Sequence, residues 1–380
     1  MAGRPAPNEI VLPPELLPGD RRFGSGPSKV RPEALARLVE AADGYLGTSH
    51  RQETVRAVVR QVRVGLAALY RLPDGYEVLL GNGGTTTFWD AAAFGLIERR
   101  SEHLAFGEFS SKFAAVTLAA PHLDDPVVIE SEPGTHPEPV ANETVDAYAL
   151  THNETSTGVA MEIRRPADAR PAGEAIVLVD GTSAAGCVRL DPTQADVYYF
   201  APQKGFAADG GLWLALCSPA SVERIERIAA TDRWRPASLD LAIALENSRL
   251  DQTYNTPALV TLFLLADTID WMLDHGGLDW AASRCDRSAE ILYGWAEASP
   301  TATPFVAKPS ERSHTSATID FDGVDASEIA AVLRANGIVD TEPYRKLGRN
   351  QLRIAMFPAI EPDDVATLTH AIDFVVDALT

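Results

Sequence analysis

Two residues of the sequence, Asp180 and Lys204, end neighbouring apolar segments and could act on one ligand. Asp180 closes the segment at 176–180, and Lys204 follows the segment at 196–203. Ligands of open α/β sheets bind at the carboxyl ends of the strands, so both side chains are expected at one sheet edge. Pyridoxal phosphate needs such a pair, because an amine forms a Schiff base with its aldehyde and a carboxylate keeps its ring nitrogen protonated. Taken alone, the pair has a plainer explanation, in which Asp180 caps a turn and Lys204 lies in solvent.

A glycine-rich segment supplies a second candidate site. The sequence GNGGTTTFWDAAAFGLI, at 81–97, runs from an expected strand through glycines and threonines into an expected helix. Glycines let the backbone approach a phosphate, and helix N-terminal N–H groups and threonine hydroxyls can donate to it. The segment lacks the Walker A and GxGxxG patterns, so it does not predict a nucleotide site. Alone, it could equally be a turn with a threonine N-cap.

The charge balance narrows the possible partners. The chain has 33 basic and 53 acidic side chains and a formal net charge of -20, which argues against nucleic acid and anionic membranes as partners. An amine nucleophile must come from few residues: Lys29, Lys112, Lys204, Lys308 and Lys346.

Positive charge nevertheless gathers in two places. His50 and Arg51 follow a Gly-Thr-Ser turn, and Arg345, Lys346, Arg349 and Arg353 lie within 341–353. Such clusters could bind an anionic substrate. The plainer reading is a solvated face for the basic stretch and an ordinary turn histidine for His50.

The elements that must position these residues are strands alternating with helical or turn segments. Seven strands are expected, at 77–82, 103–109, 126–131, 146–153, 176–181, 196–202 and 211–218. This alternation predicts an α/β fold with a mostly parallel sheet covered by helices. The last two strands are only about eight residues apart, which favours an antiparallel pair.

The chain beyond residue 219 has a different pattern. Helical stretches are expected at 221–230 and 256–277, followed by strands at 316–321 and 351–357 and helices at 325–337 and 362–379. We therefore expect an N-terminal arm (1–20) packing with the small domain, a large domain (21–268) and a small C-terminal α/β domain (269–380).

Eight segments together carry a family resemblance. They are FGSGPSKVRPE, GTSHR, GNGGTTTFWDA, HNETSTG, VDGTSAAG, FAPQKGFA, QTYNTPA and EPYRKLGRNQLR. In order and spacing they resemble the phosphoserine aminotransferases, class V enzymes of the fold type I group that use pyridoxal phosphate, and the likeness covers nearly the whole chain. It implies a homodimer with shared active sites.

The resemblance assigns roles residue by residue. It makes Lys204 the Schiff-base lysine and Asp180 the partner of the ring nitrogen. The remaining cofactor contacts are implied for Gly84, Thr85, Phe109, Thr155, Gln203, and, from the other subunit, Asn255 and Thr256. Arg353 would bind the α-carboxylate, and His50, Arg51 and Arg345 the distal phosphate or the γ-carboxylate of glutamate. Two positions depart from the family: Phe109 stands where many members have tryptophan, and Tyr344-Arg345 where some have His-Arg.

The implied reaction is the reversible transfer of an amino group from L-glutamate to 3-phosphohydroxypyruvate, giving O-phospho-L-serine and 2-oxoglutarate in serine biosynthesis. A second implied substrate is 4-phosphohydroxythreonine, in pyridoxine biosynthesis. The alternatives are a related aminotransferase for unphosphorylated serine, alanine or glyoxylate, and a phosphate- or pyridoxal-phosphate-binding regulatory protein without turnover. A cysteine desulfurase fits less well, because no cysteine follows Cys285.

The remaining sequence features favour a cytoplasmic protein without a metal. Cys187, Cys217 and Cys285 are odd in number and lack zinc-site spacing, which suits structural thiols in a reducing compartment. No signal peptide or apolar run of membrane-spanning length is recognisable.

Overall fold

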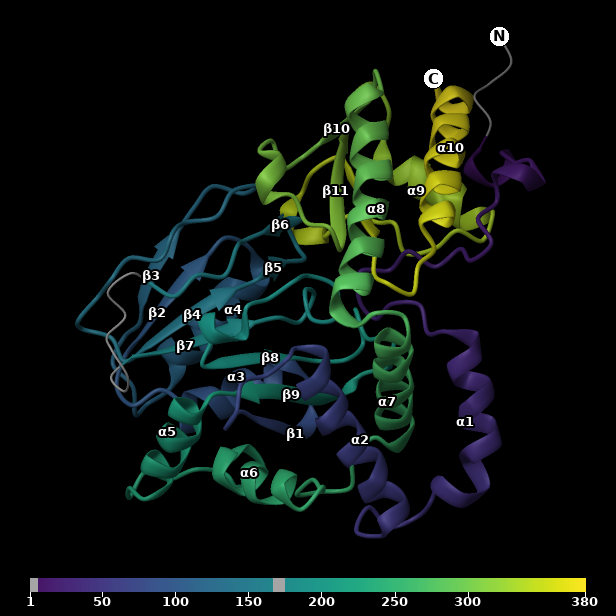
Figure 1. The fold of residues 1–380 in the computed structure, drawn as a ribbon. Coiled ribbons are helices and arrows are strands. Elements are labelled where there is room, and N and C mark those ends of the chain that lie inside the picture. The colour runs from purple at the N-terminus through teal and green to yellow at the C-terminus, as the bar shows by residue number, and fades with distance from the viewer. Residues whose placement is uncertain (1–5, 167–174) are drawn as a thin grey trace.

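The computed structural model describes residues 6–166 and 175–380. Its centre is a seven-stranded sheet with the order β1-β9-β8-β7-β4-β2-β3, drawn on the left in Figure 1. The strands of this sheet are β1 (Glu77–Gly83), β2 (Ser101–Ala105), β3 (Val127–Glu130), β4 (Ala147–Thr151), β7 (Ile176–Asp180), β8 (Val197–Phe200) and β9 (Gly211–Cys217). The α/β fold and its seven strands are thus confirmed.

The sheet is parallel except at β9. This strand runs antiparallel to both of its neighbours, β8 and β1, whereas the other neighbouring strands pair in parallel. The short connection between β8 and β9 leaves no room for a helical crossover, so the predicted antiparallel pair is confirmed. The carboxyl ends of β1, β7 and β8 consequently lie at the same edge of the sheet.

Two expected strands are shorter in the structure. The strand expected at 103–109 ends at Ala105, because α4 (Glu108–Ala119) begins three residues later. Its first N–H groups are held by side chains from another part of the chain, which the local sequence does not reveal. The strand expected at 146–153 ends at Thr151 and is followed by β5 (Asn153–Glu154), which pairs with β6 (Val159–Ala160) in a separate ribbon.

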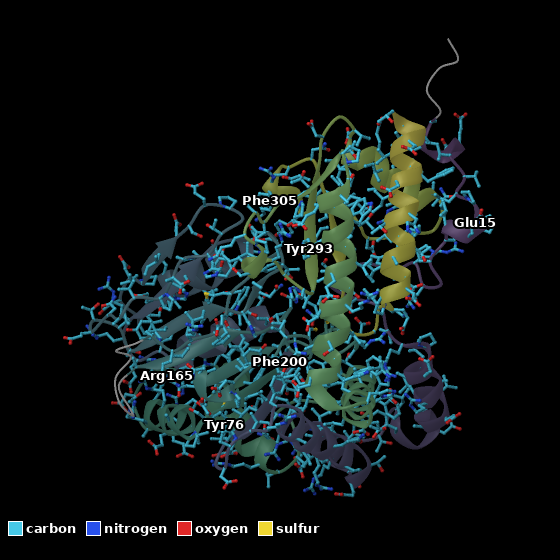
Figure 2. The ribbon with its side chains drawn as sticks, turned by 45° about the horizontal axis from the view of Figure 1, so that its top comes forward. Glu15, Tyr76, Arg165, Phe200, Tyr293 and Phe305 are labelled. Atoms are coloured by element: carbon cyan, nitrogen blue, oxygen red, sulfur yellow. The ribbon has the colours of Figure 1, made fainter. Side chains whose placement is uncertain are left out.

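Helices cover both faces of the large sheet, because successive strand residues point to opposite sides. One face carries Tyr198 and Phe200 and packs on α2 (Glu53–Leu69) and α7 (Leu259–Asp274). Figure 2 labels Phe200 inside this layer. The other face packs on α3, α4, α5 and α6. The bounds of the remaining helices here are α1 (Pro32–Tyr45), α3 (Thr85–Gly95), α5 (Pro219–Ala229) and α6 (Leu241–Arg249).

The C-terminal part forms a second α/β unit at the top right of Figure 1. An antiparallel sheet of three strands packs with three helices around a core of its own. Its elements are α8 (Gly277–Ala298), β10 (Ala302–Pro304), β11 (Ser316–Phe321), α9 (Ala326–Ala335), β12 (Gln351–Ala355) and α10 (Pro362–Leu379). The strands and helices expected beyond residue 315 are confirmed within a few residues.

The N-terminal residues pack on this second unit. Ile10 and Leu12 join its core, and the Leu12 N–H donates to Asn336 at 2.9 Å. Residues 1–5 of the expected arm lie outside the described residues. The domain boundaries after residues 20 and 268 stay a prediction, and the second of them falls within α7. No helix among the described residues is long and apolar enough to cross a membrane.

Candidate functional site

Lys204 is a buried amine in the turn after β8. It is 7% exposed, and its Nζ donates to Thr155 Oγ1 at 2.9 Å and lies 5.2 Å from the centre of the Phe109 ring. The N-terminal segment covers it closely, because a Cβ on Gly26 would lie 2.7 Å from Lys204 Cε. Burial lowers the pKa of Lys204 to about 8, although Asp180 opposes this change. A substantial fraction of the amine is therefore uncharged, and nucleophilic, slightly above neutral pH.

Asp180 is a buried carboxyl at the end of β7. Its Oδ1 accepts a hydrogen bond from the Thr182 N–H at 2.9 Å, and its Oδ2 accepts one from Trp89 Nε1 at 3.3 Å. Burial raises the pKa of Asp180, and the Thr182 hydrogen bonds and the Lys204 charge only partly offset this. A cationic N–H placed against this carboxyl would stabilise its charged form, and a protonated pyridine nitrogen has that chemistry.

The glycine-rich turn after β1 forms the expected anion cradle. Gly84 is the N-cap of α3, and open space adjoins it, since a Cβ built there would meet no atom within 4 Å. The first N–H groups of α3 have no partner within the helix. The Thr85 hydroxyl lies 2.6 Å from that of Thr182, and the buried Oε1 of Gln203 has no hydrogen-bond partner among the described residues. The open space, the free N–H groups of α3 and the threonine hydroxyls fit the phosphate of pyridoxal phosphate. Gln203 would donate to it through its Nε2 amide, because Oε1 is an acceptor.

Arg353 brings a guanidinium from β12 to the same place. Its Nη1 donates to the Thr155 carbonyl at 3.3 Å, while its buried Nε has no partner among the described residues. Burial lowers the pKa of Arg353, although Tyr344 and Glu154 oppose this, and the guanidinium lies 5.5 Å from the centre of the Tyr344 ring. An arginine buried with unused donors is suited to bind a carboxylate.

A cleft of about 530 Å³ opens beside Arg353. Its walls are the segment 24–27 and the segment 342–346, so Arg345 and Lys346 stand at its rim. The Lys346 amine donates to Glu108 Oε1 at 2.5 Å, which ties this rim to the start of α4. The structure thus brings together Lys204, Asp180, Thr155, Gln203, Phe109, Gly84, Thr85, Arg345 and Arg353 around the carboxyl ends of β1, β7 and β8.

The other predicted residues form a second group near the start of α2. Thr256 Oγ1 lies 3.2 Å from His50 Nδ1, and the Thr256 carbonyl accepts from Asn82 Nδ2 at 2.9 Å. Arg51 donates to Gln252, and Asn255 is exposed. The expected helix at 256–277 begins only at Leu259 and ends at Asp274. Thr256 is excluded because a residue before proline avoids helical angles, and Ala258 is the extended N-cap. The cross-subunit role of Asn255 and Thr256 stays a prediction.

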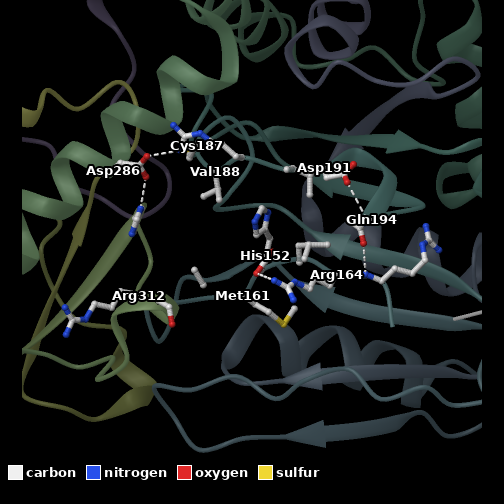
Figure 3. Close-up of a pocket in the computed structure, with 17 residues that line it drawn as sticks. His152, Met161, Arg164, Cys187, Val188, Asp191, Gln194, Asp286 and Arg312 are labelled. Atoms are coloured by element: carbon white, nitrogen blue, oxygen red, sulfur yellow. Dashed lines mark hydrogen bonds and ion pairs between the residues drawn. The ribbon is translucent and has the colours of Figure 1, made fainter. Parts of the chain in front are cut away.

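A larger cavity, of about 920 Å³, lies between the loop after β6, the loop after Cys187 and the segment 310–314 (Figure 3). Its arginines are already paired with carboxylates: Arg165 with Asp196, Arg189 with Asp286, Arg312 with Glu297, and Arg164 with Glu162. Figure 3 shows Asp286 held between the basic groups of two chain segments. The smaller cleft, in contrast, adjoins Arg353, whose buried Nε has no partner among the described residues, so we place the chemistry there.

Comparison with known proteins identifies the family. The sequence profile described as aminotransferase class-V matches residues 23–341. The chain belongs to the class V aminotransferase family. The phosphoserine aminotransferase of Rhodococcus jostii (strain RHA1) is 59% identical over 370 residues, which cover 97% of this chain and 98% of the relative. The putative phosphoserine aminotransferase of Mycobacterium leprae (strain TN) is 57% identical over 371 residues, with the same coverage.

Solved structures have the same fold as this class V aminotransferase. The phosphoserine aminotransferase of Cytophaga hutchinsonii superposes with a TM-score of 0.85 at 24% identity, covering 92% of this chain and 97% of that one. The enzyme of Bacillus circulans subsp. alkalophilus gives a TM-score of 0.79 at 21% identity, covering 94% and 98%.

Several residues that touch the site of this class V aminotransferase were not predicted. Trp89 and Thr182 bind Asp180, and Ser28 binds the Lys204 carbonyl at 2.8 Å. A signal for Trp89 existed, because it follows Thr85 by one helical turn and so lies on the same face of α3. Ser28 lies in the segment FGSGPSK, which contributed to the family resemblance without a role of its own.

The lowered pKa of Lys204 predicts how the class V aminotransferase takes up its cofactor. Only the uncharged amine attacks an aldehyde, and with a pKa of about 8 its share grows as pH rises through that value. The uptake rate of the apoprotein should therefore rise about 10-fold between about pH 7 and pH 9 and then level off. Stopped-flow absorbance measures this rate. The same measurement with N-α-acetyl-lysine in place of the apoprotein shows how much of the pH dependence comes from titration of the cofactor itself. A rate still rising above about pH 10, as for an ordinary lysine, would contradict the assignment.

Proposed function

We propose that this class V aminotransferase moves an amino group reversibly between L-glutamate and 3-phosphohydroxypyruvate, giving O-phospho-L-serine and 2-oxoglutarate. The observation that carries the proposal is the buried Lys204 amine, which shares Thr155 with Arg353 and interacts with the charge of Asp180, beside a cleft with basic side chains at its rim. Relatives named phosphoserine aminotransferase, which align over nearly the whole chain, support the same substrates.

The cofactor is pyridoxal phosphate. When bound, it supplies an aldehyde that condenses with amines and a protonated ring that accepts electron density from the substrate α-carbon. Asp180 keeps the ring nitrogen protonated, and the Thr155 hydroxyl, which binds Lys204 Nζ, is available to the ring oxygen. Gly84, Thr85 and Gln203 hold the phosphate.

Lys204 moves the proton in this reaction. As a free amine with a lowered pKa, Nζ would be the base that takes the proton from the substrate α-carbon. Gly26 packs on the lysine side chain and restricts the positions open to it. In the second half-reaction Nζ would deliver a proton to the α-carbon of the accepting 2-oxo acid, so a single base serves both amino donors.

The anionic groups of the substrates bind at two places. Arg353 takes the α-carboxylate that both donors share, and its bond to the Thr155 carbonyl fixes its orientation. Arg345 lies at the cleft rim for the distal phosphate or γ-carboxylate. We expect His50 and Arg51, in the second group beside Thr256, to contribute to the binding of the same anion. Tyr344 packs against both Arg353 and Phe109.

The functional unit in this proposal is a homodimer. Exposed apolar side chains occur on the segments that flank the second group in the sequence, at Leu46, Val64, Leu250, Tyr254 and Val260. Exposed apolar side chains of this kind favour burial against another chain. The unpartnered buried Nε2 of His50 and Oδ1 of Asn82 lie in the same region. We expect Asn255 and Thr256 to act on the partner's cofactor phosphate.

A hybrid experiment tests this sharing. Chains with Lys204→Ala are mixed with chains carrying Asn255→Ala and Thr256→Ala, each inactive or weak alone. If Asn255 and Thr256 serve the other subunit, the site that keeps Lys204 receives an intact Asn255 and Thr256 from the Lys204→Ala chain. One of the two sites in each hybrid dimer is then complete, so a hybrid dimer should have up to about half of the activity of an unsubstituted dimer. No recovery in hybrids that sedimentation shows to be dimers would contradict the sharing.

The cellular location proposed is the cytoplasm. Cys187, Cys217 and Cys285 are all buried free thiols. Unpaired cysteines suit a reducing compartment.

The substrate is tested by the absorbance spectrum of the holoprotein. O-phospho-L-serine should convert the bound cofactor to its aminated form, whereas L-serine at the same concentration should convert it at least about 100-fold more slowly, because it lacks the distal anion. Equal conversion by both would assign the enzyme to unphosphorylated substrates. A holoprotein converted by neither amino acid would contradict turnover.

Arg353→Ala should reduce turnover of L-glutamate and O-phospho-L-serine alike, because both carry the α-carboxylate. The loss of a buried charge-assisted pair predicts a fall of about 10²- to 10³-fold in kcat/KM for each donor. Arg349→Ala is the matched control, since Arg349 is exposed and pairs with Asp320. A defect confined to O-phospho-L-serine would instead place Arg353 at the distal anion.

A further inference from the structure

Glu154 is a carboxylate beneath the active site for which the mechanism above has no use. It is 0% exposed, at the end of β5. Its Oε2 accepts the backbone N–H groups of Phe109 at 3.1 Å and Ser110 at 2.9 Å, and the Ser110 hydroxyl at 3.0 Å. Its Oε1 accepts the N–H of Ser156 at 3.2 Å and the Ser156 hydroxyl at 2.7 Å. Five donors thus hold one buried anion in a single orientation.

This carboxylate caps α4 from a distant part of the chain. Ser156 Oγ also accepts the Glu108 N–H at 3.0 Å, so Glu154 and Ser156 together take the first N–H groups of the helix. The fit is close, because a Cβ on Gly107 would lie 2.3 Å from Glu154 Cγ. A negative charge at this end of a helix also interacts favourably with the helix dipole.

The capped turn carries Phe109. The centre of its ring lies 5.2 Å from Lys204 Nζ and 5.9 Å from the Tyr344 ring. A ring placed there can stack on the pyridine ring held by Asp180 and Lys204. The position of Phe109 therefore depends on the hydrogen bonds that Glu154 accepts.

Glu154 also acts on the site through its charge. The charged groups that face it are Lys204 in the turn after β8, Arg353 on β12 and Asp180 at the end of β7. The pKa of Lys204 is lowered by burial, and Glu154 is among the anions that oppose this. The adjacent residue, Thr155, binds the amine of Lys204 and the guanidinium of Arg353 directly.

We propose that Glu154 is a positioning residue of the transamination site, which holds Phe109 over the cofactor ring and places a fixed negative charge behind Lys204 and Arg353. The proposal rests on the function proposed above. Neither part of it requires Glu154 to touch a substrate.

Glu154→Gln tests both parts, because it keeps the shape, removes the charge and turns an NH₂ group toward N–H donors. In the holoprotein, the visible circular dichroism of the bound cofactor should fall at least about 2-fold as the ring above it shifts. The pH midpoint of its visible absorbance should move down by about one unit, because a nearby anion is lost. The kcat should fall about 10-fold with a smaller change in KM. Glu130→Gln, which neutralises an exposed carboxylate at the end of β3, should leave all three unchanged.

Ser156→Ala separates position from charge. It removes the cap on the Glu108 N–H and one of the five donors to Glu154, but keeps the carboxylate, so the dichroism should change while the pH midpoint stays within about 0.3 units. Because it is the milder change, Ser156→Ala still tests the positioning role if the Glu154→Gln protein does not fold. Unchanged dichroism in both variants would overturn the positioning role, and an unchanged midpoint in a folded Glu154→Gln protein would overturn the role of the charge.

The two proposals fail differently in this experiment. If the unsubstituted protein binds pyridoxal phosphate and is converted by O-phospho-L-serine, the proposed function stands whatever Glu154→Gln does. If the unsubstituted protein shows no cofactor absorbance, the proposed function fails before Glu154 is examined.

Discussion

Lys204→Ala is expected to lower transamination by on the order of 10⁴-fold or more, because one amine both attaches the cofactor and moves the α-proton. Lys204 is the buried lysine whose Nζ donates to Thr155 Oγ1. The measurement is 2-oxoglutarate formation from L-glutamate and 3-phosphohydroxypyruvate under saturating cofactor. A small amine such as methylamine should restore part of the rate, since it can serve as the missing base.

Lys112→Ala is the matched control for this loss. Lys112 lies on α4 near the cleft, but its side chain is 47% exposed and pairs with Glu108 at 3.2 Å. Its removal should change kcat by less than about 2-fold, because an exposed ion pair contributes little. Near-native transamination by Lys204→Ala, or a large loss in Lys112→Ala, would show that the amine has been assigned to the wrong residue.

The sequence alone predicted those features of the site that depend on the direction of the strands. Asp180 and Lys204 each follow a run of apolar residues, and parallel neighbouring strands must end at the same edge. The pairing of β7 with β8 places Asp180 opposite Tyr199, five residues before Lys204 in the chain. The Gly84-Thr85 turn is equally local, since it is a strand, a glycine and a helix start in succession. These signals lie within short segments, so no tertiary information was needed.

What could not be predicted depends on contacts between distant segments. Trp89 reaches Asp180 across 91 positions of sequence, and Glu154 caps a helix 44 positions earlier. The end of the strand expected at 103–109 depends on this cap, because nothing within the segment itself satisfies the first N–H groups of α4. Helix α8, which was not predicted, has a mixed apolar pattern, and its buried face is defined by packing against α10, α7, β10 and β11.

Asp180→Asn is expected to lower kcat by about 10³-fold while the cofactor remains bound. The substitution keeps the shape of the side chain but removes the charge that holds the ring nitrogen protonated. An amide also cannot accept hydrogen bonds at both atoms, so it must lose either the Thr182 N–H or the Trp89 indole. Both effects act on the same group, which is why the loss should exceed that from any one neighbour.

Two further variants help to explain this loss in kcat: one isolates the indole hydrogen bond, and the other is a matched control. Trp89→Phe removes only the indole donor at 3.3 Å and should cost about 3- to 10-fold in kcat. Asp191→Asn should have no effect, because Asp191 is an exposed cap whose bond to the Thr193 N–H an asparagine also makes. Steady-state rates with both amino donors measure these losses, and the cofactor spectrum shows that binding persists. A fully active Asp180→Asn protein would mean that the carboxylate is not needed to keep the ring protonated, and the buried anion would then be only a structural cap.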